Sequence, residues 1–152
     1  MESVCFRVKI VLISPIMARL TYKMPALDPH DPTGDSTWDV GLEQGQIEIL
    51  LREDGKVNDK VRLYRLVLAQ EVVKNPDAVF EGWQRPDQDD GLCYVGQPEI
   101  DYIRRDVEAP APPGKVFCVY IAGSGKIVRW SWELADEVYG VEDRFRSKLW
   151  PA

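Results

Sequence analysis

The chain has 152 residues, the length of one ordinary domain, and we expect residues 1–152 to form a single globular domain. Hydrophobic residues make up 45% of the sequence, which excludes disorder of the whole chain. The net charge of −6 disfavours broad, non-specific binding to nucleic acid or to an anionic membrane, and no apolar run reaches the length of a membrane span.

Near the N-terminus, residues 4–13 alternate between a wholly apolar set and a mixed set, which predicts a strand with one apolar face. Arg7 and Lys9 interrupt the apolar run and Glu2 stands where a signal peptide carries positive charge, so we interpret the segment as a strand. Met17 begins a more ordinary start, which leaves open that residues 1–16 are an N-terminal extension.

Residues 25–45 are rich in proline, glycine and aspartate and are predicted to be one long loop. After it, the alternation of isoleucine and leucine over residues 46–52 predicts a strand. Residues 59–74 follow with apolar positions spaced 3, 4 and 4, which predicts an amphipathic helix whose core-facing stripe is Val61, Tyr64, Leu68 and Val72. Asn75-Pro76 is typical of a helix start, so residues 76–82 are predicted to form a short second helix.

Residues 91–96 predict a short strand, and residues 97–114 a loop that ends in a proline run. Two apolar runs, 115–122 and 126–133, then flank a Gly-Ser-Gly break, which predicts a β-hairpin. Its first strand is apolar on both faces and is expected in the middle of a sheet. On its second strand we expect two faces: Val128, Trp130, Trp132 and Leu134 on one, and Ile127, Arg129, Ser131 and Glu133 on the other.

The remaining residues carry a helical spacing of 3, 4 and 4 through Val138, Val141, Phe145 and Leu149, interrupted by Gly140, which predicts a short or broken last helix. Together these elements predict an α+β fold, an antiparallel sheet with the C-terminal hairpin at its centre and one or two helices packed on it. Three cysteines without metal-ligand spacing are expected to be free and to indicate a cytoplasmic protein.

Two short motifs resemble ligand-binding loops without matching them, and one acidic segment is a candidate metal site. Gly123 to Lys126 lacks the upstream glycine and following Ser or Thr of a phosphate loop, and the acidic turn at 87–91 lacks the glycine and glutamate spacing of a calcium loop. Asp28, His30 and Asp31 are candidates for a metal or acid–base site, although the only histidine cannot make a typical zinc site alone. No cofactor is predicted.

Aromatic and polar residues of the hairpin offer two further candidates. Four tryptophans are expected in the core, with a stacking platform for bases or sugars as the alternative: Trp83, Trp130, Trp132 and Trp150. The polar set Arg129, Ser131 and Glu133 either faces solvent or forms the floor of a cleft. The matching positions of the partner strand are apolar, which indicates that this polar face is partly covered. We therefore rank this set first among the candidate sites.

The order helix, NPDAVFEG, GLCYVG and the hairpin KVFCVYIA-GSG-KIVRWSWEL resembles the core of the barnase, EndoU and RelE-like nucleases over residues 58–134. The resemblance rests on element order and implies metal-independent RNA cleavage by side chains of the sheet face. Those side chains would be Arg129, Ser131 and Glu133, with Arg85 in a neighbouring turn. The sheet lacks the histidine common in such enzymes, and the acidic chain is poorly suited to grip a polyanion.

Two functions therefore remain. The first is a module that binds another protein or a small ligand without chemistry, which fits the charge and the lack of a complete catalytic motif. The second is an endoribonuclease in which Glu133 is the base and Arg129 the cation at the phosphate.

Overall fold

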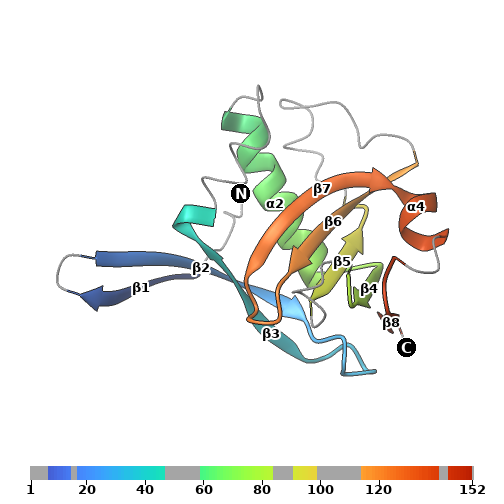
Figure 1. Cartoon of the computed structure of the whole chain (residues 1–152), viewed down its shortest axis with the longest axis horizontal. Coiled ribbons are helices and arrows are strands. Elements are labelled where there is room, and N and C mark those ends of the chain that lie inside the picture. The colour runs from blue at the N-terminus through green and yellow to red at the C-terminus, as the bar shows by residue number, and fades with distance from the viewer. Residues whose placement is uncertain are drawn as a thin grey trace.

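The computed structural model describes residues 7–14, 17–46, 59–83, 91–98, 114–140 and 144–151. The fold is α+β, as predicted, with two antiparallel sheets and a helix between them (Figure 1). The elements are β1 (Arg7–Ser14), β2 (Met17–Leu27), β3 (Thr37–Glu43), α2 (Asp59–Lys74), β4 (Ala78–Glu81), β5 (Leu92–Gly96), β6 (Lys115–Ile121), β7 (Ile127–Leu134), α4 (Ala135–Gly140) and β8 (Ser147–Trp150).

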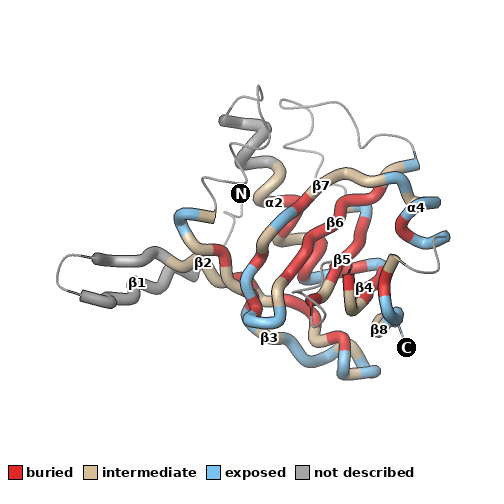
Figure 2. Tube along the Cα trace, viewed as in Figure 1, coloured by how far each residue is buried: buried red, intermediate tan, exposed pale blue. Residues whose placement is uncertain are grey.

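The larger sheet has five strands in the order β7-β6-β5-β4-β8, and every neighbouring pair is antiparallel. The predicted hairpin is confirmed as β6 and β7, although β7 is the outer strand of the described sheet and not central, and the strand predicted at 91–96 is confirmed as β5. β6 lies between β5 and β7 and is buried along almost its whole length (Figure 2). Its two apolar faces are therefore explained by cover on both sides of the sheet.

The hairpin turn closes with a hydrogen bond from Ala122 N to Lys126 O at 2.8 Å, and Gly125 takes a φ of 87° that favours glycine. The pairing slips after Tyr120, which faces Arg129, because Ile121 faces Ile127 and Val128 is left without a partner. Ile127 consequently packs in the same core as Trp130, whereas Val128 packs on the opposite face. The predicted assignment of these two residues to faces was wrong for this reason.

The smaller sheet is a three-stranded meander, β1-β2-β3, which confirms the predicted N-terminal strand and corrects the predicted loop at 25–45. Only residues 28–36 connect β2 to β3, because residues 25–27 belong to β2 and residues 37–43 form β3. Pro25 is tolerated in β2 because the pairing with β1 ends at Lys23, so the strand has one neighbour there among the described residues. Met24 and Val40 face each other and are fully buried.

Helix α2 has the predicted bounds, 59–74, and packs between the two sheets against β2, β5 and β6. Leu68 and Val72 are buried as expected, while the side chains of Val61 and Tyr64 lie outside the described part. The main core joins residues of the helix, the meander and one face of the five-stranded sheet. Because all three contribute to one core, the helix ties the meander to the larger sheet.

The short helix predicted at 76–82 was wrong, because these residues contain β4. Helix α2 ends just before it, with a last bond from Asn75 N to Glu71 O at 2.9 Å. Val79 then packs in the main core and Ala78 and Phe80 pack on the other face of the sheet. Burial on both faces overrides the local helix-start signal of Asn75-Pro76.

The last helical segment is short, as the glycine indicated, and α4 ends at Gly140. The helical spacing does not continue to Leu149, which lies in β8 and pairs this part of the chain with β4. Val138 and Phe145 form a second, smaller core with the face of the sheet that points away from α2. Side chains on that face are thus partly covered.

Some predictions fall on residues that the structure does not describe. The strand predicted at 46–52 lies there except for Gln46, which is in a helical turn, and so does most of the loop at 97–114. Among the residues that are described, no helix has both the length and the apolar character needed to cross a membrane.

Candidate functional site

The register of the hairpin places polar side chains on the sheet face that points away from α2. Tyr120 lies opposite Arg129, Cys118 opposite Ser131, and Val116 opposite Glu133. Directly opposed residues in an antiparallel pair share a face, so these residues stand on one surface of the sheet. The predicted set of Arg129, Ser131 and Glu133 is brought together in this way.

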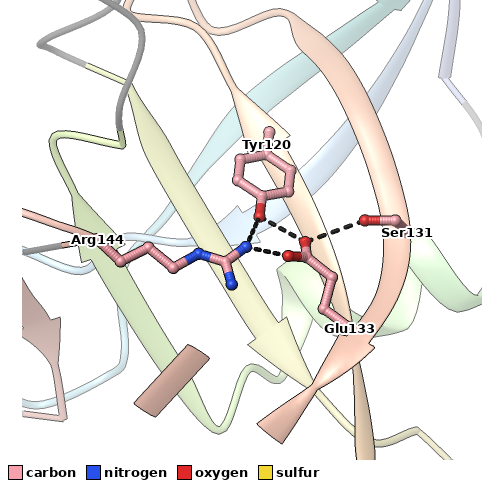
Figure 3. A network of polar contacts seen from close by, with 4 residues as sticks. All are labelled: Tyr120, Ser131, Glu133 and Arg144. Carbon is pink, nitrogen blue, oxygen red and sulfur yellow. Dashed lines mark hydrogen bonds and ion pairs between the residues drawn. The ribbon is translucent and has the colours of Figure 1, made fainter. Parts of the chain in front are cut away.

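Glu133 is the centre of a polar network with Tyr120, Ser131 and Arg144, hereafter the Glu133 network (Figure 3). Glu133 Oε2 accepts hydrogen bonds from the Tyr120 hydroxyl at 2.5 Å and from Ser131 Oγ at 3.0 Å. Arg144 Nη2 pairs with Glu133 Oε1 and also donates to the Tyr120 oxygen at 2.7 Å. The carboxylate therefore has a donor on each oxygen before any ligand arrives.

The surroundings of Glu133 fix its charge. Burial would raise the pKa of Glu133, but the hydrogen bonds from Tyr120 and Arg144 outweigh it and hold that pKa below its usual value. Burial, together with the neighbouring carboxylate and thiols, raises the pKa of the Tyr120 phenol. The network accordingly contains an ionised carboxylate and a protonated phenol at neutral pH.

The thiols beside the network are unsuited to nucleophilic chemistry. Cys93 and Cys118 are free and fully buried. The hydrogen bond to Cys93, and then burial, raise the pKa of the Cys118 thiol. Since the thiolate is the reactive form, Cys118 is inert in this state.

Arg129 adds a second cation next to the network. Its guanidinium carbon lies 4.1 Å from the centroid of the Tyr120 ring, a cation–π contact, and the residue is exposed. Within the described ranges no carboxylate pairs with Arg129, and Arg144 makes both of its network bonds through Nη2 alone. Two guanidinium groups thus stand beside one carboxylate, which leaves this surface with local positive charge.

Sequence reasoning missed Tyr120 and Arg144. Tyr120 was counted among the apolar residues of the first hairpin strand, and its side chain is only 1% exposed. Arg144 stands in the segment expected to continue the last helix. The register opposite Arg129 would have revealed Tyr120, whereas nothing local to Arg144 indicates that it reaches Glu133. Arg85, the fourth predicted residue, lies outside the described residues.

The predicted Asp28 and His30 line a different feature, a cleft of about 400 Å³ between the loop at 28–36 and one end of the five-stranded sheet. We call it the loop cleft. The lining residues come from the β2–β3 loop, β3, β4, β5, the hairpin turn and the residue before β8: Asp28, Pro29, His30, Trp38, Glu81, Leu92, Ala122, Gly123 and Arg146. The loop cleft and the Glu133 network share no residue.

Asp31 is used by the loop itself. Its carboxylate accepts bonds from Thr33 N at 3.0 Å, Thr33 Oγ1 at 2.7 Å and Ser36 N at 3.0 Å. The bonds from Thr33 and Ser36 lower the pKa of Asp31 well below its usual value. Across the described part of the chain, no three His, Cys, Asp or Glu side chains gather as metal ligands would.

The four tryptophans pack in or against the core: Trp83 and Trp130 are buried, and Trp132 and Trp150 are partly buried. Trp130 and Trp83 are 5% and 4% exposed, and Trp132 packs edge-on against Phe117 with centroids 5.2 Å apart. The Trp150 ring lies so close to Gly34 that an added Cβ there would be 2.7 Å from it. These positions agree with the core interpretation of the tryptophans.

No family model, curated protein or solved structure matches the chain. The architecture is an α+β fold with an antiparallel five-stranded sheet and α2 packed against it.

Proposed function

We propose that the chain is a cytoplasmic binding module whose partner, a protein or a small ligand, places one anionic group against Arg129 and Arg144. The observation that carries the proposal is that two guanidinium groups contact Tyr120: Arg129 lies over its ring, and Arg144 bonds to its hydroxyl and pairs with Glu133. Guanidinium groups bind carboxylate and phosphate oxygens through paired donors. The fixed Glu133 network holds Arg144 in place before the partner arrives.

The acidic charge of the chain limits how many anionic groups a partner can carry. A net charge of −6 opposes a long polyanion, whose binding needs many phosphate contacts, but it does not oppose one anionic group at a locally positive site. A single phosphate or carboxylate therefore fits better than an extended nucleic acid.

The test is a titration of the full chain with inorganic phosphate, in which NMR chemical shifts report binding. Arg129→Ala is expected to weaken binding about fivefold or more, because a charged hydrogen bond to the ligand is lost. Lys148→Ala is the matched control, since it removes an exposed cation of β8 that is absent from the network. Equal affinities for the two variants and the wild type would contradict the proposal.

A second candidate is a metal-independent endoribonuclease of barnase- or RelE-like fold. It is favoured by one observation, that Glu133, Tyr120 and two arginines gather on the sheet face opposite the helix. In this mechanism Glu133 accepts the proton of the 2′-hydroxyl, the guanidinium groups stabilise the charged phosphate, and the Tyr120 hydroxyl is a proton donor. The low pKa of Glu133 makes it a weak base, and His30 lies in the loop cleft instead.

An RNA cleavage assay in chelator, at neutral and mildly acid pH, separates the two candidates. The nuclease candidate predicts cleavage that Glu133→Gln abolishes, and a flatter salt dependence of RNA binding in Arg129→Ala. The binding module leaves RNA intact. Recovery of intact RNA from the wild type would eliminate the nuclease, while the phosphate titration still tests the binding module.

A further inference from the structure

The loop cleft has the size and lining of a small-molecule site. Its volume of about 400 Å³ falls within the range of small-ligand pockets. Trp38 and Leu92 supply an aromatic and an aliphatic surface, and Asp28, Glu81 and Arg146 supply charge. Such a mixture of apolar walls and few polar groups is typical of sites that bind a ligand body and orient one end of it.

The Trp38 ring is fixed before any ligand binds. Its Nε1 donates to the Tyr94 hydroxyl at 2.8 Å, and Tyr94 in turn donates to Leu27 O at 2.6 Å. Gly125 of the hairpin turn approaches the same ring so closely that an added Cβ would lie 3.2 Å from it. A wall held in this way loses little conformational entropy on binding, which favours affinity.

The two carboxylates of the cleft differ in what they already bind. Glu81 accepts a bond from Ser147 Oγ at 2.6 Å and pairs with Arg146 at 3.2 Å, so its charge is matched. The Asp28 carboxylate accepts the His30 backbone N–H through Oδ1 at 2.9 Å, and this is its one hydrogen bond within the described residues. The cleft therefore carries two carboxylates and one guanidinium, and Asp28 Oδ2, which accepts no hydrogen bond within the described residues, is the oxygen available to a ligand.

We propose that the loop cleft binds a small organic cation, an amine carried on an aromatic or apolar body. The ammonium group pairs with Asp28, and the body packs against Trp38 and Leu92. This inference concerns a site separate from the Glu133 network and does not depend on the function proposed for that network.

The test uses three ligands that share one ring and differ in charge: tyramine, the neutral alcohol tyrosol and 4-hydroxyphenylacetate. Each is titrated into the full chain, and binding is followed by the indole N–H resonance of Trp38, assigned with a Trp38→Phe variant. Tyramine is expected to bind about tenfold or more tightly than the alcohol, because it adds a charged hydrogen bond, and the anion is expected to bind most weakly.

Asp28→Asn is the decisive variant, because asparagine keeps the Oδ1 acceptor of the loop but replaces the charged Oδ2 acceptor with an NH2 donor. It should reduce tyramine affinity about tenfold and abolish the preference for tyramine over tyrosol. Asp35→Asn removes the same charge from an exposed position of the same loop that does not line the cleft, and it should leave the affinity within about twofold. Circular dichroism checks that both variants fold.

Three results would overturn the proposal: equal affinity for the three ligands, equal effects of Asp28→Asn and Asp35→Asn, or no saturable shift of the Trp38 resonance with tyramine up to about 10 mM.

Discussion

Individual residues of the Glu133 network show how a carboxylate can stay ionised although burial favours its neutral form. The Glu133 side chain is 17% exposed, and each of its oxygens receives a donor. Burial alone would favour the neutral acid, but Tyr120, Arg144 and Ser131 favour the anion more strongly. The carboxylate therefore contributes to stability only while it is ionised.

This balance predicts the effect of Glu133→Gln on stability and its dependence on pH. The amide cannot match the Arg144 cation, so the variant should lose about 1–3 kcal/mol of unfolding free energy at pH 7. Because the folded pKa of Glu133 lies below its usual value of 4.5, the wild-type contribution is present above that value and is lost as the pH falls through the folded pKa. The difference between wild type and variant should shrink as the pH falls below 4.5 and through the folded pKa.

Urea unfolding at pH 7 and at acid pH measures this difference. Glu137→Gln is the control, because Glu137 is exposed on α4 and its replacement should change stability by less than about 0.5 kcal/mol. A Glu133→Gln loss that stays constant with pH would show that the charge of Glu133 is not what stabilises the network.

At the scale of elements, the hairpin turn connects two parts of the molecule. Gly125 adopts a φ of 87°, its N–H donates to Ala122 O at 2.8 Å, and its own carbonyl accepts the Gly41 N–H of β3 at 2.8 Å. The turn of the larger sheet is thereby bonded to the edge of the smaller one, and it also backs the Trp38 wall of the loop cleft.

Comparing Gly125→Ala with Gly114→Ala separates backbone strain from this contact. Both glycines have a positive φ, 87° and 73°, which costs about 1–2 kcal/mol for alanine. Only at Gly125 would the new Cβ meet Trp38, at 3.2 Å, whereas at Gly114 it meets nothing within 4 Å. Gly125→Ala should therefore be the more destabilising in thermal unfolding, and equal losses would show that Trp38 yields without cost.

The elements also show which helices and strands a local sequence pattern can predict. The hairpin, β5 and α2 were predicted because each carries a strong local pattern and lies where that pattern is satisfied by burial. β3 was missed because its buried residues, Val40 and Leu42, are separated by glycine within a stretch next to many prolines and aspartates. β4 was missed because partners distant in sequence, not its own residues, make it a strand.

The candidate site was predicted only in part, for the same physical reason. Arg129, Ser131 and Glu133 share a strand, so alternation placed them on one face. Arg144 and Tyr120 join them through tertiary contacts and register, which a single sequence does not reveal. Asp28 and His30 were singled out by their residue types, but the cleft that they line is formed by strands far along the chain.

At the scale of the whole molecule, both apolar and polar contacts hold the two sheets together. They share one hydrophobic core through α2, and the buried hydroxyl of Tyr94 in β5 adds a specific polar link to the meander. That hydroxyl donates to Leu27 O at 2.6 Å and accepts from Trp38 Nε1 at 2.8 Å. Burial raises the pKa of Tyr94 well above its usual value, so the phenol remains protonated and the donor remains in place.

Replacing Tyr94 by phenylalanine tests that link. The variant leaves the Leu27 carbonyl and the Trp38 N–H without this partner, so it should lose about 1–3 kcal/mol of stability. The loss of stability should be greater in the meander, because the packing of β5 against β6 and α2 is retained while the meander loses one of its polar contacts with the larger sheet. Hydrogen exchange of the β2 and β3 amides should accelerate more than that of the β5 and β6 amides.

Tyr139→Phe is the matched control, since that tyrosine is 49% exposed on α4. Removal of its hydroxyl should leave the stability almost unchanged. If Tyr94→Phe accelerated exchange equally in both sheets, the meander and the larger sheet would open as one unit. The hydrophobic core around α2, rather than the hydroxyl, would then account for their attachment. Faster exchange confined to β2 and β3 would instead show that the Tyr94 hydroxyl, in addition to the Gly41–Gly125 bond, keeps the Trp38 side of the loop cleft against the five-stranded sheet.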